Sequence, residues 1–92
     1  MRQCLLITLT VGSIKGFLDN FIKKHATNLR LEGVAKLVSD DCVRIVICGD
    51  RDHIDDFIDA LYEKSDKYSL DEIQVESFFK KKDYRGIFRV IA

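Results

Sequence analysis

Two glycines, Gly12 and Gly16, bound a stretch whose residue types suit the binding of an anion. The stretch reads Gly12-Ser13-Ile14-Lys15-Gly16-Phe17, and it follows an apolar segment and opens an amphipathic helical pattern. At such a place, successive backbone N–H groups and a helix N-terminus together favour an anion such as phosphate. We therefore expect an anion-binding loop made of Ser13, Ile14, Lys15, Gly16, Phe17 and Leu18, with Lys15 adding positive charge.

The hydrophobic pattern predicts the elements that hold this loop. Residues 4–10 alternate as a strand does, and apolar residues recur at helical spacing over 17–29. The rest of the chain predicts strands over 34–38, 42–48, 71–79 and 86–91, a second helix capped by Asp50 or Asp52, and a loop at 65–67.

The order of these elements is β-α-β-β-α-β with a short fifth strand. It predicts a single α+β domain over residues 1–92 with the ferredoxin-like arrangement. Two helices would cover one face of an antiparallel sheet, and the other face would be turned toward water.

Composition excludes several classes of partner. Fifteen basic and fifteen acidic residues cancel, so no strong field attracts nucleic acid or an anionic membrane. No apolar run reaches the ~20 residues of a membrane span, and no secretory leader is evident. We expect a cytoplasmic protein whose three cysteines are small, buried or half-buried thiols, although Cys4 can approach Cys48. No His or Cys spacing suits a metal, and we expect no cofactor.

The glycines and their surroundings resemble the acylphosphatase family, small enzymes that hydrolyse acyl phosphates. That family carries Gly-x-Val-Gln-Gly-Val-x-Phe-Arg before its first helix and Leu-x-Gly-x-Val-x-Asn on its second strand. Here Gly12 and Gly16 match the first motif, Leu31 and Gly33 match the second, and the spacing over 33–49 agrees without a gap. The resemblance implies that loop N–H groups and the arginine hold the phosphoryl group, while the asparagine orients the attacking water.

Both of those side chains are missing from this chain. Counting back from Ala26 places Asp19 at the arginine position, whereas counting forward from the glycines places Asn20 there. Leu37 stands at the asparagine position and has no polar group to orient water. The resemblance therefore implies an acylphosphatase-like domain that is non-catalytic or very weakly active and keeps residual phosphate binding at the loop. Whether it is an enzyme stays open.

Two other functions are also open. Lys15 and Asn20 can rebuild the site of a functioning acylphosphatase, which would convert acyl phosphates to carboxylate and phosphate. The open sheet face can instead serve a protein partner or a weak homodimer through an apolar patch of Cys4, Leu6, Thr8, Val46 and Cys48.

The same residues have a purely structural interpretation. Gly12 and Gly16 can be turn residues, and Asp19 can be a partner of the helix dipole. We expect His25 and His53 to be solvated on helix surfaces and Lys80–Lys82 to be a solvated turn.

Overall fold

The computed structural model describes residues 2–12, 16–77 and 87–91. The first helix is continuous from Phe17 to Asn28 and is π-helical in its first part. The elements are β1 (Arg2–Val11), η1 (Phe17–Lys23), α1 (Lys24–Asn28), β2 (Glu32–Leu37), β3 (Cys42–Asp50), α2 (Arg51–Glu63), α3 (Ser65–Tyr68), β4 (Leu70–Ser77) and β5 (Phe88–Ile91).

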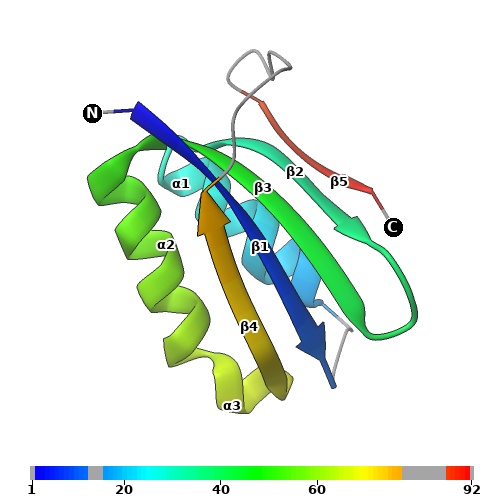
Figure 1. The fold of residues 1–92 in the computed structure, drawn as a ribbon. Coiled ribbons are helices and arrows are strands. Elements are labelled where there is room, and N and C mark those ends of the chain that lie inside the picture. The colour runs from blue at the N-terminus through cyan, green and yellow to red at the C-terminus, as the bar shows by residue number, and fades with distance from the viewer. Residues whose placement is uncertain (1, 13–15, 78–86, 92) are drawn as a thin grey trace.

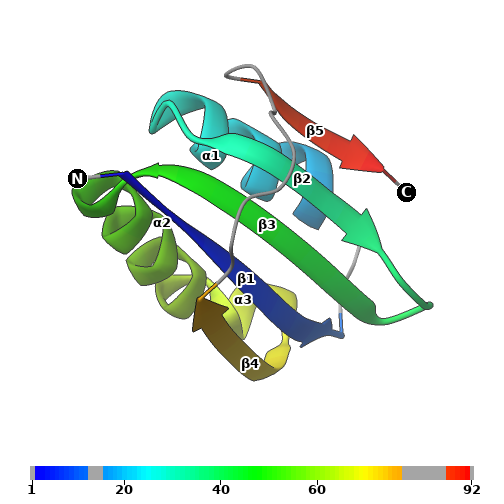
Figure 2. The ribbon, with the colours of Figure 1, turned by 45° about the horizontal axis from the view of Figure 1, so that its top comes forward.

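The five strands form one sheet in the order β4-β1-β3-β2-β5. Two helices lie side by side on one face of this sheet (Figures 1 and 2). One is the continuous helix of η1 and α1, and the other is α2. This confirms the predicted ferredoxin-like arrangement. The sheet is mixed and not purely antiparallel as expected, because β5 runs parallel to its neighbour β2. Although β4 and β5 follow each other in the chain, they occupy opposite edges of the sheet, so β5 pairs with β2 and not with β4.

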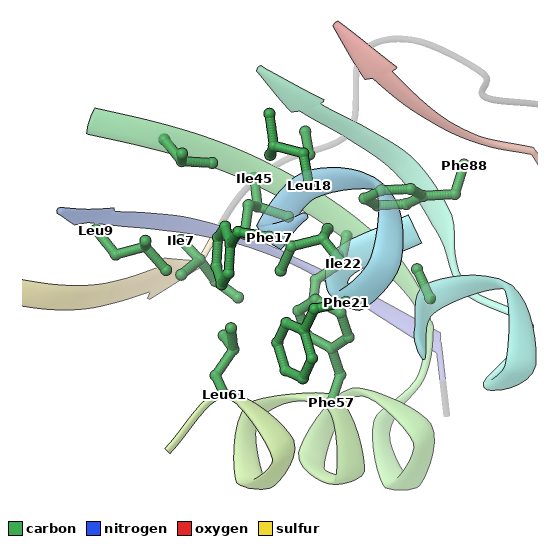
Figure 3. Packing of buried hydrophobic residues seen from close by; sticks show 14 of the residues in the cluster. Ile7, Leu9, Phe17, Leu18, Phe21, Ile22, Ile45, Phe57, Leu61 and Phe88 are labelled. Carbon is green, nitrogen blue, oxygen red and sulfur yellow. The ribbon is translucent and has the colours of Figure 1, made fainter. Parts of the chain in front are cut away.

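The core fills the space between the sheet and the helices. Alternate residues of the central strands, such as Ile7 of β1 and Ile45 of β3, are fully buried on this face. Phe57 and Leu61 of α2 point into the same layer as the side chains of η1 (Figure 3). The buried residues of η1 come in pairs repeated every four positions: Phe17, Leu18, Phe21 and Ile22. Burying each such side chain contributes roughly 1.5–3 kcal/mol, so the helix that follows the glycines is firmly anchored.

The other face of the sheet is less open than predicted. Val46 and Cys48 alternate with core residues along β3 and so belong to this face, yet they are 8% and 0% exposed. Cys4, Leu6 and Thr8, which share the face, are half-buried. Of the five residues in the expected apolar patch, Val46 and Cys48 are therefore buried and the other three are partly exposed.

Residues 65–67 form a helical turn, α3, and not the loop that the sequence suggests. The turn places the side chain of Tyr68 in the core, where it is 9% exposed. The backbone of Ser69 then adopts a left-handed conformation, with φ 53°, and this ends α3. At the start of α2, Asp50 is the N-cap residue as expected, although its side chain makes no capping hydrogen bond.

The cysteines also differ from the expectation. The register of β1 and β3 puts Cys4 directly opposite Cys48, with 4.1 Å between their Cα atoms, and the two sulfurs form a disulfide. Cys42 keeps a free, half-buried thiol. The prediction of buried thiols is therefore wrong for Cys4 and Cys48, because the pairing of the two central strands brings them together.

Reduction of this disulfide is expected to lower the stability of the fold. The crosslink joins residues 44 positions apart, and closing a loop of that length in the unfolded chain is worth up to about 4 kcal/mol. Thermal unfolding with and without a dithiol reductant measures the effect, and Cys48→Ser should mimic reduction. Cys42→Ser is the matched control and should keep the full response to reductant. Equal unfolding temperatures for oxidised and reduced protein would contradict the expectation.

Gly33→Ala is expected to destabilise the sheet severely. Gly33 has φ 140°, and a Cβ there would overlap the carbonyl oxygen of Val46 on the adjacent strand. Strain and overlap together should cost roughly 3 kcal/mol or more in chemical denaturation. Gly49→Ala is the matched control, because its Cβ would meet mainly the movable end of Leu31 and should cost less. Equal losses in the two variants would refute this account of Gly33.

Candidate functional site

β1 finishes at the end of the sheet where β3 and β4 begin (Figure 1), and Gly12, the first residue of the glycine loop, directly follows β1. The backbone before it is fixed by a hydrogen bond from the Val11 N–H to the Asp41 carbonyl, at 2.6 Å. Of the six expected anion-binding residues, Ser13, Ile14 and Lys15 lie outside the described residues. Gly16, Phe17 and Leu18 lie within them.

Gly16 makes the turn into the helix. Its φ of 76° and ψ of −8° are left-handed, a conformation that glycine adopts without steric cost. Gly16 is also the N-cap residue of η1, so no capping side chain covers the N–H groups of the first turn. Phe17 and Leu18 are 0% and 6% exposed, so their side chains serve the core. Only their backbone N–H groups are left to serve a ligand.

Asn20 lies against the second glycine of the loop. Its backbone N–H donates to the Gly16 carbonyl at 2.9 Å. Its side-chain Nδ2 would stand 3.0 Å from a Cβ built on Gly16, and the three atoms nearest to that point all belong to Asn20. Asp19 is exposed in the first turn of η1, where its carboxylate favours the helix dipole. Among the described residues, the structure thus places the amide of Asn20 beside the glycine.

Leu37 ends β2 on the side of the sheet that carries the helices. It alternates with the buried Ala35 along the strand, pairs with Val43 of β3, and packs half-buried against the core. Its neighbour Lys36 is exposed on the opposite face, as the alternation of a strand requires. An aliphatic side chain, Leu37, therefore occupies the position at which the resemblance implies a water-orienting asparagine.

Neither histidine is the fully solvated side chain that the sequence suggests. His25 is half-buried, its Nδ1 lies 2.9 Å from the Phe21 carbonyl oxygen, and its ring lies 4.4 Å from that of Phe21. His53, also half-buried, helps to line a shallow hollow of about 360 Å³ at the start of α2. That hollow is at the far end of β3 from Gly12, so His53 is not placed to act on a ligand at the glycine loop.

Metal binding and membrane insertion can be judged for the part of the chain that the structure describes. Within it, no three His, Cys, Asp or Glu side chains are grouped so that they could hold a metal ion. The helices there are all too short or too polar to cross a membrane. The predicted basic turn, Lys80–Lys82, lies outside the described residues.

Comparison with known proteins agrees with this geometry. The family model for acylphosphatase matches residues 12–90. An acylphosphatase structure from Coxiella burnetii is 28% identical with a TM-score of 0.82, covering 97% of this chain and 92% of that one. The acylphosphatase from Bacillus subtilis has the same fold, with 18% identity, a TM-score of 0.83 and full coverage of both chains.

The same fold also occurs within a larger protein. HypF from T. kodakarensis is 25% identical with a TM-score of 0.75, but this chain covers only 12% of it. Among curated proteins no sequence matches. The family model covers residues 12–90, which is nearly the whole chain after β1. This chain therefore belongs to the acylphosphatase family.

Proposed function

We propose that this chain is a degenerate acylphosphatase domain, which binds phosphate or an acyl phosphate at the glycine loop and hydrolyses it very weakly or not at all. The observation that carries the proposal is the place of Leu37, which packs against the core at the position of the water-orienting asparagine. A leucine in the core layer has neither a donor nor an acceptor for water.

The loss of the arginine has a separate consequence. Neither Asp19 nor Asn20, the two residues at its position, has the planar pair of donors with which a guanidinium grips a phosphoryl group. Removing a single donor of this kind from an active site typically costs about 10²–10³-fold in kcat. With the asparagine gone as well, positioning and charge stabilisation, the main contributions to phosphoryl transfer, are both reduced.

Retained anion binding is supported by what remains at the loop. Gly16 keeps the left-handed turn that opens a helix without a capping side chain, and the first-turn N–H groups of a helix attract negative charge. Lys15 is the cationic residue of the loop sequence. Asp19 opposes the anion, but its carboxylate is exposed and therefore screened by solvent.

A second candidate, an active hydrolase with a rebuilt site, is favoured by one observation. The side-chain amide of Asn20 lies beside Gly16, where it can donate to a phosphate oxygen or orient a water molecule. Lys15 would then supply the positive charge. The third function, a weak homodimer through the open sheet face, has less support because Val46 and Cys48 are buried. The cytoplasmic location stays a prediction.

Phosphate binding is expected to appear in an amide NMR titration. Shifts should be confined to the loop and the first turn of η1, with a dissociation constant in the millimolar range. Lys15→Gln should weaken binding about 3- to 10-fold, because it removes the one loop cation. The matched change Asp19→Asn should strengthen binding about 2-fold. Absence of shifts at Gly16, Phe17 and Leu18, or shifts centred on the start of α2, would refute the anion site.

Catalysis is tested with a small aromatic acyl phosphate, whose hydrolysis is followed by absorbance. The wild type is expected to stay within about tenfold of the spontaneous rate. Asn20→Arg combined with Leu37→Asn should raise kcat/KM by about 10² or more, since it restores both family groups on an intact frame. Asp19→Arg with Leu37→Asn is the control for the other register and should gain less.

The opposite outcome would favour the rebuilt site. If the wild type already matches the Asn20→Arg, Leu37→Asn variant, and Asn20→Ala abolishes that activity, the degenerate-domain proposal is wrong.

A further inference from the structure

The Cys4–Cys48 disulfide belongs to a row of three side chains that crosses the centre of the sheet. Cys4 of β1 is directly opposite Cys48 of β3, and Cys48 is directly opposite Glu32 of β2. Opposite residues of paired strands project from the same face, with their Cβ atoms about 5 Å apart. The two sulfurs and the Glu32 side chain are therefore neighbours on the face of the sheet away from the helices, and β4 lies beyond Cys4 on the other side of β1.

The two ends of this row differ in their exposure to solvent. Cys48 is 0% exposed, and Glu32, the residue beyond it, is 4% exposed. Cys4, at the other end of the disulfide, is only half-buried. Within the described residues, the pairing of β1 with β4 begins at Leu5, opposite Ser77, and does not include Cys4. Of the two cysteines, Cys4 is therefore the one that solvent reaches.

The chemistry of thiol–disulfide exchange makes this difference important. A thiolate must reach one sulfur of the disulfide from the side opposite the other sulfur, which leaves, so access decides which sulfur is attacked. An in-line approach to Cys48 would have to pass through the place of Glu32 on β2, which is buried. An in-line approach to Cys4 comes from the side of β4, where Cys4 is partly exposed. The arrangement of the strands therefore directs an external thiolate to the Sγ of Cys4.

We propose that Cys4 and Cys48 form a thiol–disulfide exchange site of the folded protein, in which a dithiol attacks Cys4 and Cys48 is the leaving sulfur. A thiolate of the dithiol forms a bond to the Cys4 Sγ, the bond between the two cysteines breaks, and its electron pair leaves on the Cys48 Sγ. The second sulfur of the dithiol, as a thiolate, then attacks the first, and the Cys4 Sγ leaves.

The net reaction transfers two electrons and two protons. The dithiol is oxidised to its disulfide, and the two protons that it loses end on the sulfurs of Cys4 and Cys48. The inference is independent of the phosphate site proposed above, because Cys4 and Cys48 lie near the end of β1 and β3 that is remote from Gly12.

The rate of reduction tests whether the folded protein reacts. With dithiothreitol as the dithiol, the rate should rise in proportion to its concentration under conditions in which the protein stays folded. Leu61→Ala, a fully buried change near the end of α2, destabilises the fold on the helix side of the sheet and is the control. It should leave the rate within about 3-fold of the wild type. An increase of about 30-fold or more in Leu61→Ala would show that reduction requires unfolding, and it would overturn the proposal.

A second measurement on the wild type serves the same purpose without a mutation. Urea below the unfolding transition raises the unfolded population steeply and leaves the folded structure in place. The rate of reduction by dithiothreitol should change less than about 3-fold over this range. A rate that follows the unfolded population would contradict attack on the folded protein.

The sulfur that is attacked is identified with single thiols. In a Cys42→Ser background, Cys48→Ser leaves the Cys4 thiol and Cys4→Ser leaves the Cys48 thiol. Oxidised glutathione should form a mixed disulfide with Cys4 at least about 100-fold faster than with Cys48 in the folded proteins, and at similar rates in denaturant. A Cys48 thiol that reacts as fast as Cys4 in a folded variant would refute the assignment.

Mapping of the wild-type protein decides the point where a single-thiol variant does not fold. Reduced glutathione, a monothiol, is added to the oxidised protein, and the mixed disulfide is trapped with acid. Peptide mass mapping should find glutathione on Cys4 and a free thiol at Cys48. Glutathione in equal or greater amount on Cys48 would overturn the proposed direction of attack.

Discussion

The pairing of β1 with β3 is the constraint on which the rest of the molecule depends. These strands are antiparallel neighbours at the centre of the sheet, in register from Arg2 opposite Asp50 to Thr10 opposite Cys42. A shift of one residue would turn Ile7 and Ile45 out of the core and separate Cys4 from Cys48. The same register brings Val11 to Asp41 at the end of β1. The place where the glycine loop begins therefore follows from the pairing of two strands.

The sheet and the main helices could be predicted because their signals are local. Apolar residues alternate along β1 and β3 and recur in pairs along η1. Each pattern predicts which face of the element is buried. What could not be predicted depends on contacts across the fold. The turn α3 has a polar sequence and forms around one buried ring, Tyr68. Three other features also depend on strands that are distant in the sequence and neighbours in the sheet. These are the parallel pairing of β5 with β2, the burial of Val46 and Cys48, and the disulfide.

The candidate site rests on counting along the sequence. The spacing from Gly33 leads to Leu37 without ambiguity, because both residues lie on one regular strand, β2, where counting is reliable. The choice between Asp19 and Asn20 could not be made by counting, because the two counts disagree by one residue. Both residues are exposed, but the atoms nearest to a Cβ built on Gly16 all belong to Asn20, a distinction that depends on how η1 starts.

The fold itself requires two of the glycines of this chain, and this limits what a glycine motif alone can mean. Gly33 is required by the carbonyl of Val46 and Gly12 by the approach of Ser69, whether or not phosphate binds. Both would persist in a domain that had lost its chemistry. The arginine and asparagine of the family motifs are not required in this way. At position 37, leucine buries apolar surface against the core, which an amide side chain would not do. Replacing such side chains therefore need not disturb the glycines on which the fold depends.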